Sequence, residues 1–143
     1  MKPLSRIGLL VMVGGIVGLF ALRSLFATDP AVIGVQAAAV ALMVWARATF
    51  GRRSFHATAD PTEGGLVTTG PYAFVRHPIY TAVCLFATAG AAAHLSFATA
   101  ALAVMVFLGA VARMIPEERL VVARYPEYAA YAARTSRMVP HVF

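Results

Sequence analysis

Four long apolar runs dominate this sequence, and they limit what the chain can fold into. They cover residues 7–26, 31–50, 79–93 and 95–115. The hydrocarbon core of a bilayer is about 30 Å thick, and a helix rises about 1.5 Å per residue, so about 20 apolar residues cross it. The third run is the shortest of the four. The pattern predicts an all-α protein, an integral membrane bundle of four transmembrane helices.

Composition agrees with a membrane protein and excludes several kinds of site. Hydrophobic residues make up 60% of the chain and charged residues 13%, against about 45–50% and about 25% in soluble domains. The 143 residues leave room for a single domain, residues 1–143. The single cysteine, Cys84, lies in an apolar run, which excludes a disulfide framework. His56, His94 and His141 lack metal-ligand spacing, so we expect no metal.

Two features bear on how the spans are connected. Pro78 suits the first turn of a helix, and Ala91 to Ser96 suits a tight hairpin, so runs three and four are predicted to form a helical pair. The first run could instead be a signal peptide, because basic residues precede it and Ala27 follows it. Arg23 interrupts the expected cleavage region, and cleavage would leave three spans, so we favour four.

The distribution of basic residues predicts the orientation. With the N-terminus in the cytoplasm, Arg23 alone lies outside and the other eleven of the 12 Lys and Arg residues lie inside. We therefore expect both termini in the cytoplasm and the protein in the cell (inner) membrane. The net charge of +6 then faces anionic lipid headgroups, and we predict no nucleic-acid partner.

The cytoplasmic loop 51–78 and the tail 116–143, which we expect to include a helical segment, remain to carry chemistry. A site built from them lies at the membrane surface. It is open to a water-soluble cofactor from one side and to a lipophilic substrate from the bilayer. This arrangement suits group transfer onto a lipid.

The stretch GPYAFVRHPIYTA, residues 70–82, concentrates polar and rigid side chains between two apolar runs. Pro78 places Arg76 and His77 at a helix N-terminus, where free N–H groups and the helix dipole favour an anionic group. The faces of Tyr72 and Tyr80 can stack on a nucleobase or attract a cation. The alternative is that these aromatic and basic residues are interfacial anchors, which are common at the ends of membrane helices.

A second stretch, ARMIPEERL at residues 112–120, places charges where the fourth span leaves the bilayer. If the helix continues past Ile115, Arg113 and Glu117 lie four residues apart on one face. The alternative here is an exposed ion pair, which contributes about 0.5 kcal/mol at most.

Four motifs in one order resemble a known superfamily. They are GRRSF at residues 51–55, GLVTTGPYAFVRHPIY at 65–80, R-x-x-x-E-E at 113–118 and YPEYAAYAARTSRMVP at 125–140. The sequence resembles the isoprenylcysteine carboxyl methyltransferase and phospholipid methyltransferase superfamily, in its small prokaryotic-type form. The resemblance covers Gly51 to Pro140, and the first two helices match only in being hydrophobic.

The resemblance implies that S-adenosylmethionine binds at the cytoplasmic face. It also implies that Arg113 faces the substrate. Eukaryotic members carry a histidine just before the LVT stretch, where this chain has Gly64 and Gly65, so any side-chain role there is lost. The expected cofactor contacts are Gly64, Gly65, Leu66, Val67, Tyr72, Arg76, His77, Pro78, Ile79, Tyr80 and Glu117.

The residue types fit methyl transfer, an in-line displacement in which alignment and electrostatics supply most of the rate. We expect tyrosine faces to hold the sulfonium and Glu117 to take a ribose hydroxyl or an ammonium. We assign the cofactor carboxylate to Arg76, His77 and the adjacent helix end. A carboxylate acceptor, the preferred reading, needs no base. An amine acceptor needs one, and His77 or Glu118 are the candidates.

Other acceptors and other functions stay open. Phospholipid amines and small thiols or acids are compatible as acceptors. Sterol-reductase-like membrane proteins share a similar C-terminal pattern and use a nicotinamide cofactor, but they usually have more spans. A non-catalytic membrane subunit is the other alternative. In the tail, tyrosines at near-helical spacing favour a lid or brace over the cofactor.

Overall fold

The computed structural model describes residues 2–51 and 65–143. No strand forms within these residues, so the predicted all-α class is confirmed for them. The elements, in chain order, are α1 (Lys2–Ala21), α2 (Pro30–Phe50), the short 3-10 helix η2 (Gly70–Ala73), α3 (Pro78–Ala93), α4 (Phe97–Arg124) and α5 (Tyr128–Ala133).

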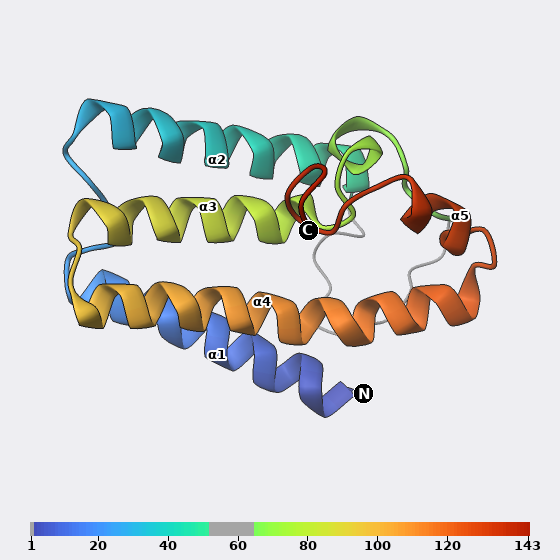
Figure 1. Cartoon of the computed structure of the whole chain (residues 1–143), viewed down its shortest axis with the longest axis horizontal. Coiled ribbons are helices and arrows are strands. Elements are labelled where there is room, and N and C mark those ends of the chain that lie inside the picture. Colours follow the sequence, from blue (N-terminus) through green and yellow to red (C-terminus); the bar gives the residue numbers. More distant parts are fainter. Residues whose placement is uncertain (1, 52–64) are drawn as a thin grey trace.

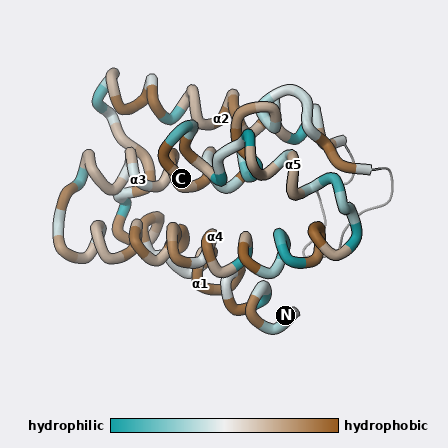
Figure 2. The backbone as a smooth tube through the Cα atoms, turned by 45° about the vertical axis from the view of Figure 1, so that its right-hand side comes forward, coloured by the Kyte–Doolittle hydropathy of each residue, from teal (hydrophilic) through white to brown (hydrophobic). Residues whose placement is uncertain are grey.

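Three of the helices are long and apolar enough to cross a membrane, as in an integral membrane protein. They are α1 from Pro3 onwards, α2 and α4, whereas α3 has 16 residues and falls short of that length. Figure 2 shows hydrophobic residues along the helices, and hydrophilic residues near α5 and the C-terminal end of α4. Length and composition thus support three of the four predicted spans.

Helix α1 begins earlier than its apolar run and ends before Arg23. The first turn, from Lys2, is polar and still helical. A transmembrane helix can extend past its apolar segment into the interface. Arg23 has φ 55°, a left-handed conformation that a helix cannot continue through. Asp29 then starts α2, with its Oδ1 accepting the N–H groups of Ala31 and Val32 at 2.9 and 3.2 Å.

Helix α4 is longer than the predicted span. It runs for 28 residues, about 42 Å at the usual rise, which exceeds the bilayer core. The helix continues through Pro116, which has no N–H and leaves the carbonyl of Ala112 without its usual helical donor. As a result, Arg113, Glu117 and Glu118 stand on one continuous helix.

Glycines allow α1 and α4 to cross at close range. A Cβ on Gly109 would lie 2.5 Å from the Met12 nitrogen and 2.7 Å from the Gly8 oxygen. One on Gly15 would lie 2.9 Å from the Leu102 oxygen. In Figure 1, α2, α3 and α4 lie side by side and α1 crosses α4 at an angle. Small residues thus serve here as they do in other membrane bundles, where they permit close backbone approach.

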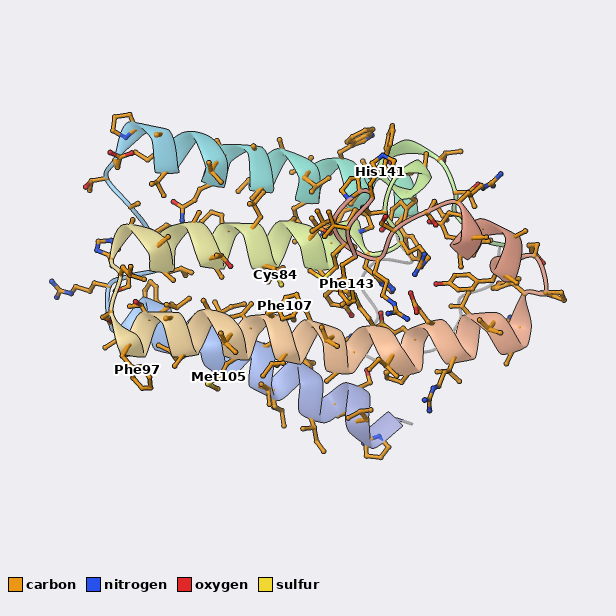
Figure 3. The ribbon with its side chains drawn as sticks, in the orientation of Figure 1. Cys84, Phe97, Met105, Phe107, His141 and Phe143 are labelled. Carbon is orange, nitrogen blue, oxygen red and sulfur yellow. The ribbon has the colours of Figure 1, made fainter. Side chains whose placement is uncertain are left out.

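Residues 134–143, which we call the C-terminal strap, return from α5 to the N-terminal end of α3. Val75 and Ser136 form an isolated parallel bridge. The Thr81 hydroxyl donates to the Met138 carbonyl at 2.9 Å, and Met138 is buried. The Phe143 ring lies 6.3 Å from the Phe107 ring, and Figure 3 shows it between α3 and α4. The strap therefore covers one side of the α3–α4 groove.

Candidate active site

A polar network joins α3 to α4 at the end of the bundle that holds α5. The Tyr80 hydroxyl donates to Glu117 Oε1 at 2.6 Å and accepts from Arg113 Nε at 2.7 Å. The Arg113 guanidinium also lies 3.3 Å from Glu117 Oε1 and 5.9 Å from the centre of the Tyr80 ring. The predicted four-residue pair of Arg113 and Glu117 therefore forms. Arg113 is 5% exposed, so the pair is not the solvent-exposed ion pair of the alternative interpretation.

A second network surrounds Glu118. Its Oε1 accepts from Arg76 Nε at 2.9 Å and lies 3.2 Å from His77 Nε2, and its Oε2 accepts from Arg137 Nε at 3.1 Å. These partners come from the loop before α3, from the N-cap of α3 and from the strap. Glu118 Oε1 contacts the start of α3 and Oε2 contacts the strap, so this carboxylate joins the two segments.

The two adjacent glutamates differ in what they leave available. Every hydrogen bond that the described residues make to the Glu117 carboxylate goes to Oε1. The Glu117 side chain is 22% exposed, against 13% for Glu118. Glu117 therefore has a carboxylate oxygen without a hydrogen bond from the described residues and a partly exposed side chain, whereas both Glu118 oxygens have protein partners.

Besides Glu118, Arg76 binds the end of α5 and the strap. Its NH1 donates to the carbonyl of Ala132 at 3.0 Å and to that of Thr135. Its backbone N–H donates to Ser136 at 2.8 Å, and the N–H of His77 donates to Arg137 at 2.9 Å. These contacts use donors that the sequence had assigned to a cofactor carboxylate.

The free N–H groups at the start of α3 are fewer than its position suggests. Pro78, the first residue of α3, has no N–H and is fully buried. The N–H of Thr81 already pairs with the His77 carbonyl at 3.0 Å. The N–H groups of Ile79 and Tyr80 are then the ones without an intrahelical partner. An anionic group at this helix end meets those two donors.

Tyr72 lies on η2 and is almost wholly enclosed. It is 6% exposed, and its ring lies 5.4 Å from that of Phe50. Its backbone carbonyl accepts the Tyr131 hydroxyl at 2.7 Å. Burial raises the pKa of Tyr131 to about 12, so this hydroxyl stays protonated and remains a donor. Burial likewise raises the pKa of Tyr72.

Three more of the predicted cofactor contacts, Gly65, Leu66 and Val67, precede η2. Gly65 is exposed and has φ 83°, a backbone conformation that favours glycine. Leu66 and Val67 are half-buried, and no hydrogen bond or ion pair of the described residues joins either one to Glu117 or Glu118. Gly64 lies outside the described residues. Within those residues, no group of three or more His, Cys, Asp or Glu side chains could hold a metal ion.

Sequence reasoning missed the roles of Arg137 and Tyr131. Both lie in the tail motif, where the tyrosine stripe indicated only a lid or brace. Arg137 reaches Glu118 across a turn and a short helix, and Tyr131 reaches the backbone of η2. The only available signal was their occurrence in the tail motif, which did not reveal their partners.

Comparisons with known proteins add a family match. A model of the phospholipid methyltransferase family matches residues 30–128. The cobalt-zinc-cadmium resistance protein CzcN of Cupriavidus metallidurans is 37% identical over 78 residues, which is 54% of this chain and 36% of that protein. The chain thus spans about a third of that relative's length. No solved structure matches.

Proposed function

The chain belongs to the phospholipid methyltransferase family, and from that premise we propose that it transfers a methyl group from S-adenosylmethionine to a lipophilic acceptor at the cytoplasmic membrane face. The observation that carries this proposal is the state of Glu117. Its carboxylate is held by Tyr80 and Arg113 through Oε1, with Oε2 left for a ligand. A fixed, partly exposed acid beside a helix N-terminus suits a cofactor with cationic and hydroxyl groups.

The residues present fit S-adenosylmethionine in three respects. Glu117 Oε2 can accept a hydrogen bond from a ribose hydroxyl or from the ammonium group. The N–H groups of Ile79 and Tyr80 can bind the carboxylate, together with the positive end of the α3 dipole. The Tyr80 face can lie against the sulfonium, which supplies the transferable methyl group.

The protein's own contribution to the displacement is alignment. Tyr80 is held from two sides, by Arg113 and by Glu117, so its ring has little freedom to move. A fixed geometry accelerates the reaction by orienting the reacting groups. Orientation matters here because methyl transfer is a direct displacement that needs no covalent intermediate with the protein. The enclosed position of Arg113 also strengthens its electrostatic effect on a charged acceptor.

For the acceptor we propose a carboxylate first and a phospholipid amine second. A buried guanidinium favours an anionic group, and a carboxylate needs no base. For an amine acceptor, His77 is the better candidate base, because Glu118 already pairs with Arg76, His77 and Arg137. A small-molecule thiol is a further possible acceptor.

We also propose the four-span arrangement with both termini in the cytoplasm of a single domain. Helix α3 lies between α2 and α4 (Figure 1), so it shares their depth despite its 16 residues. Eleven of the 12 basic residues then lie on one side. Accessibility of terminal tags in sealed cells tests this, and an external C-terminal tag would contradict the arrangement.

Titration calorimetry in detergent tests the cofactor assignment. We expect S-adenosylmethionine to bind and a nicotinamide dinucleotide not to bind. Binding of the dinucleotide would favour the reductase-like alternative, and binding of neither would favour a non-catalytic subunit. A methyl-transfer assay with labelled cofactor and a membrane lipid extract, with mass identification of the product, then identifies the acceptor.

A further inference from the structure

An apolar cavity, partly open to its surroundings, lies in the helix bundle. It has a volume of about 250 Å³ and is bounded by α1, the loop after it, α2 and α3. Leu25, Ala39, Met43, Val83 and Phe86 are among its lining residues, and all of its lining residues are apolar. No residue of α4 or of the strap contributes to it.

The cavity begins one helical turn from the polar network. Tyr80, Val83 and Ala87 are spaced three and four residues apart, so they follow one face of α3. Val83 and Ala87 line the cavity, and Tyr80 bonds to Arg113 and Glu117. At the usual rise, Ala87 lies about 10 Å deeper than Tyr80. A chain lying along this face therefore leads to the hydroxyl of Tyr80.

Size and chemistry limit what the cavity can hold. Its volume equals that of roughly eight water molecules in the liquid, yet a water molecule needs two to four polar partners, and this lining offers none. The same volume fits part of one hydrocarbon chain. Ala39, Ala82 and Ala87 are at most 2% exposed, and their small side chains leave the space unfilled.

Within the described residues, protein packing occupies two other sides of the network. On one side, α1 and α4 are in backbone contact at Gly8 and Gly109. On the other, the strap covers the α3–α4 groove, with Met138 buried and Phe143 against Phe107. The cavity between α1, α2 and α3 is an apolar hollow that the described residues form one helical turn from Tyr80.

We propose that this cavity binds a single hydrocarbon tail of the methyl acceptor, which places its reactive head beside Tyr80 and Arg113. This inference rests on the proposed function. It adds that the enzyme recognises the acceptor by one hydrocarbon chain. This chain enters the cavity from the bilayer between α1 and α2. Residues that line the cavity then set the tail that the enzyme accepts.

Two neighbouring alanines of α2 provide a matched test. Ala39 lines the cavity, whereas Ala38 is exposed on the outer side of the same helix. The probe is palmitic acid that carries a photoactivatable diazirine in its chain. In the wild type, we expect labelling of Met43, Val83 or Phe86. Ala39→Leu should lower this labelling about tenfold, and Ala38→Leu should leave it unchanged.

The same variants are assayed for methyl transfer into a membrane lipid extract. We expect Ala39→Leu to raise the apparent KM about tenfold while kcat and the affinity for S-adenosylmethionine stay unchanged. If labelling falls but KM does not, the cavity holds bulk lipid and the proposal is wrong. Labelling outside the cavity, or equal effects of both variants, also overturns it. If Ala39→Leu does not fold, the smaller Ala39→Val is used, with Met43→Ala expected to increase labelling.

Failure of the proposed function gives a different result. In that case the wild type transfers no methyl group to any acceptor in the extract. The comparison of KM values requires a wild type that transfers methyl groups, whereas the labelling results do not. The labelling pattern alone still decides whether the cavity takes a hydrocarbon chain.

Discussion

The Tyr80 hydroxyl donates a 2.6 Å hydrogen bond to Glu117 Oε1, and this contact links the first turn of α3 to the C-terminal third of α4. It directs one carboxylate oxygen toward protein partners and leaves the other for a ligand. Neighbouring Glu118 uses both oxygens for Arg76, His77 and Arg137. Two adjacent acids on one helix therefore have separable roles, and substitution can distinguish them.

Glu117→Gln should weaken S-adenosylmethionine binding about tenfold, or about 1.4 kcal/mol, because an amide replaces the ionised oxygen that holds a cofactor group. The fold should persist, since the side chain is 22% exposed. Titration calorimetry measures the affinity. Glu127→Gln is the control, because Glu127 is exposed and makes no side-chain cap on α5. If the affinity of Glu117→Gln is unchanged, Glu117 pairs with Arg113 and does not bind the cofactor.

Glu118→Gln should act on stability more than on the cofactor. Removing the charge weakens the hydrogen bonds from Arg76 and Arg137, and a hydrogen bond to a charged group contributes about 1.5–3 kcal/mol, with the more exposed Arg137 contributing least. We expect a lower thermal midpoint in detergent and faster tryptic cleavage at Arg134 and Arg137 in the strap. A variant with wild-type stability and lost cofactor affinity would instead place Glu118 against the cofactor.

The sequence predicted the helices better than it predicted the contacts between them. The apolar runs located four helices, because burial in lipid requires a continuous apolar stretch. The Arg113–Glu117 pair followed from helical spacing alone, since a local period fixes which side chains meet. In contrast, the continuation of α4 through Pro116 ran against the helix-breaking tendency of proline. Helix packing overrides that tendency.

The strap shows why the rest of the site was not predictable. Its contacts with α4 and with the start of α3 join residues far apart in the chain, such as Arg137 with Glu118, 19 positions apart, and Val75 with Ser136, 61 positions apart. No periodic pattern encodes pairings at such separations. Arg76 was assigned to a cofactor carboxylate because a basic residue at a helix N-terminus fits an anion. Backbone carbonyls of the strap and Glu118 provide the same electrostatic match from within the protein.

Gly109→Ala should destabilise the bundle by about 1–3 kcal/mol, the usual cost of overpacking. The new Cβ would lie 2.5 Å from the Met12 nitrogen and 2.7 Å from the Gly8 oxygen, both of which are backbone atoms that cannot rotate away. Gly14→Ala is the matched control, because no atom lies within 4 Å of its Cβ. Alanine favours the helix, so this control should be neutral or stabilising by up to about 1 kcal/mol. Equal thermal midpoints would argue against a close α1–α4 crossing.

Arg113→Lys should lower methyl transfer roughly ten- to hundredfold, or about 1.4 to 2.7 kcal/mol. Arg113 bonds to Tyr80 through Nε and to Glu117 through NH2, and a lysine ammonium keeps the charge but not this two-pronged geometry. The loss should appear in turnover, because Tyr80 and the acceptor lose their alignment. Affinity for S-adenosylmethionine should fall less than in Glu117→Gln, because Tyr80 still holds Glu117 Oε1. Full turnover in Arg113→Lys, or a cofactor loss as large as that of Glu117→Gln, would contradict a role for Arg113 in placing the acceptor.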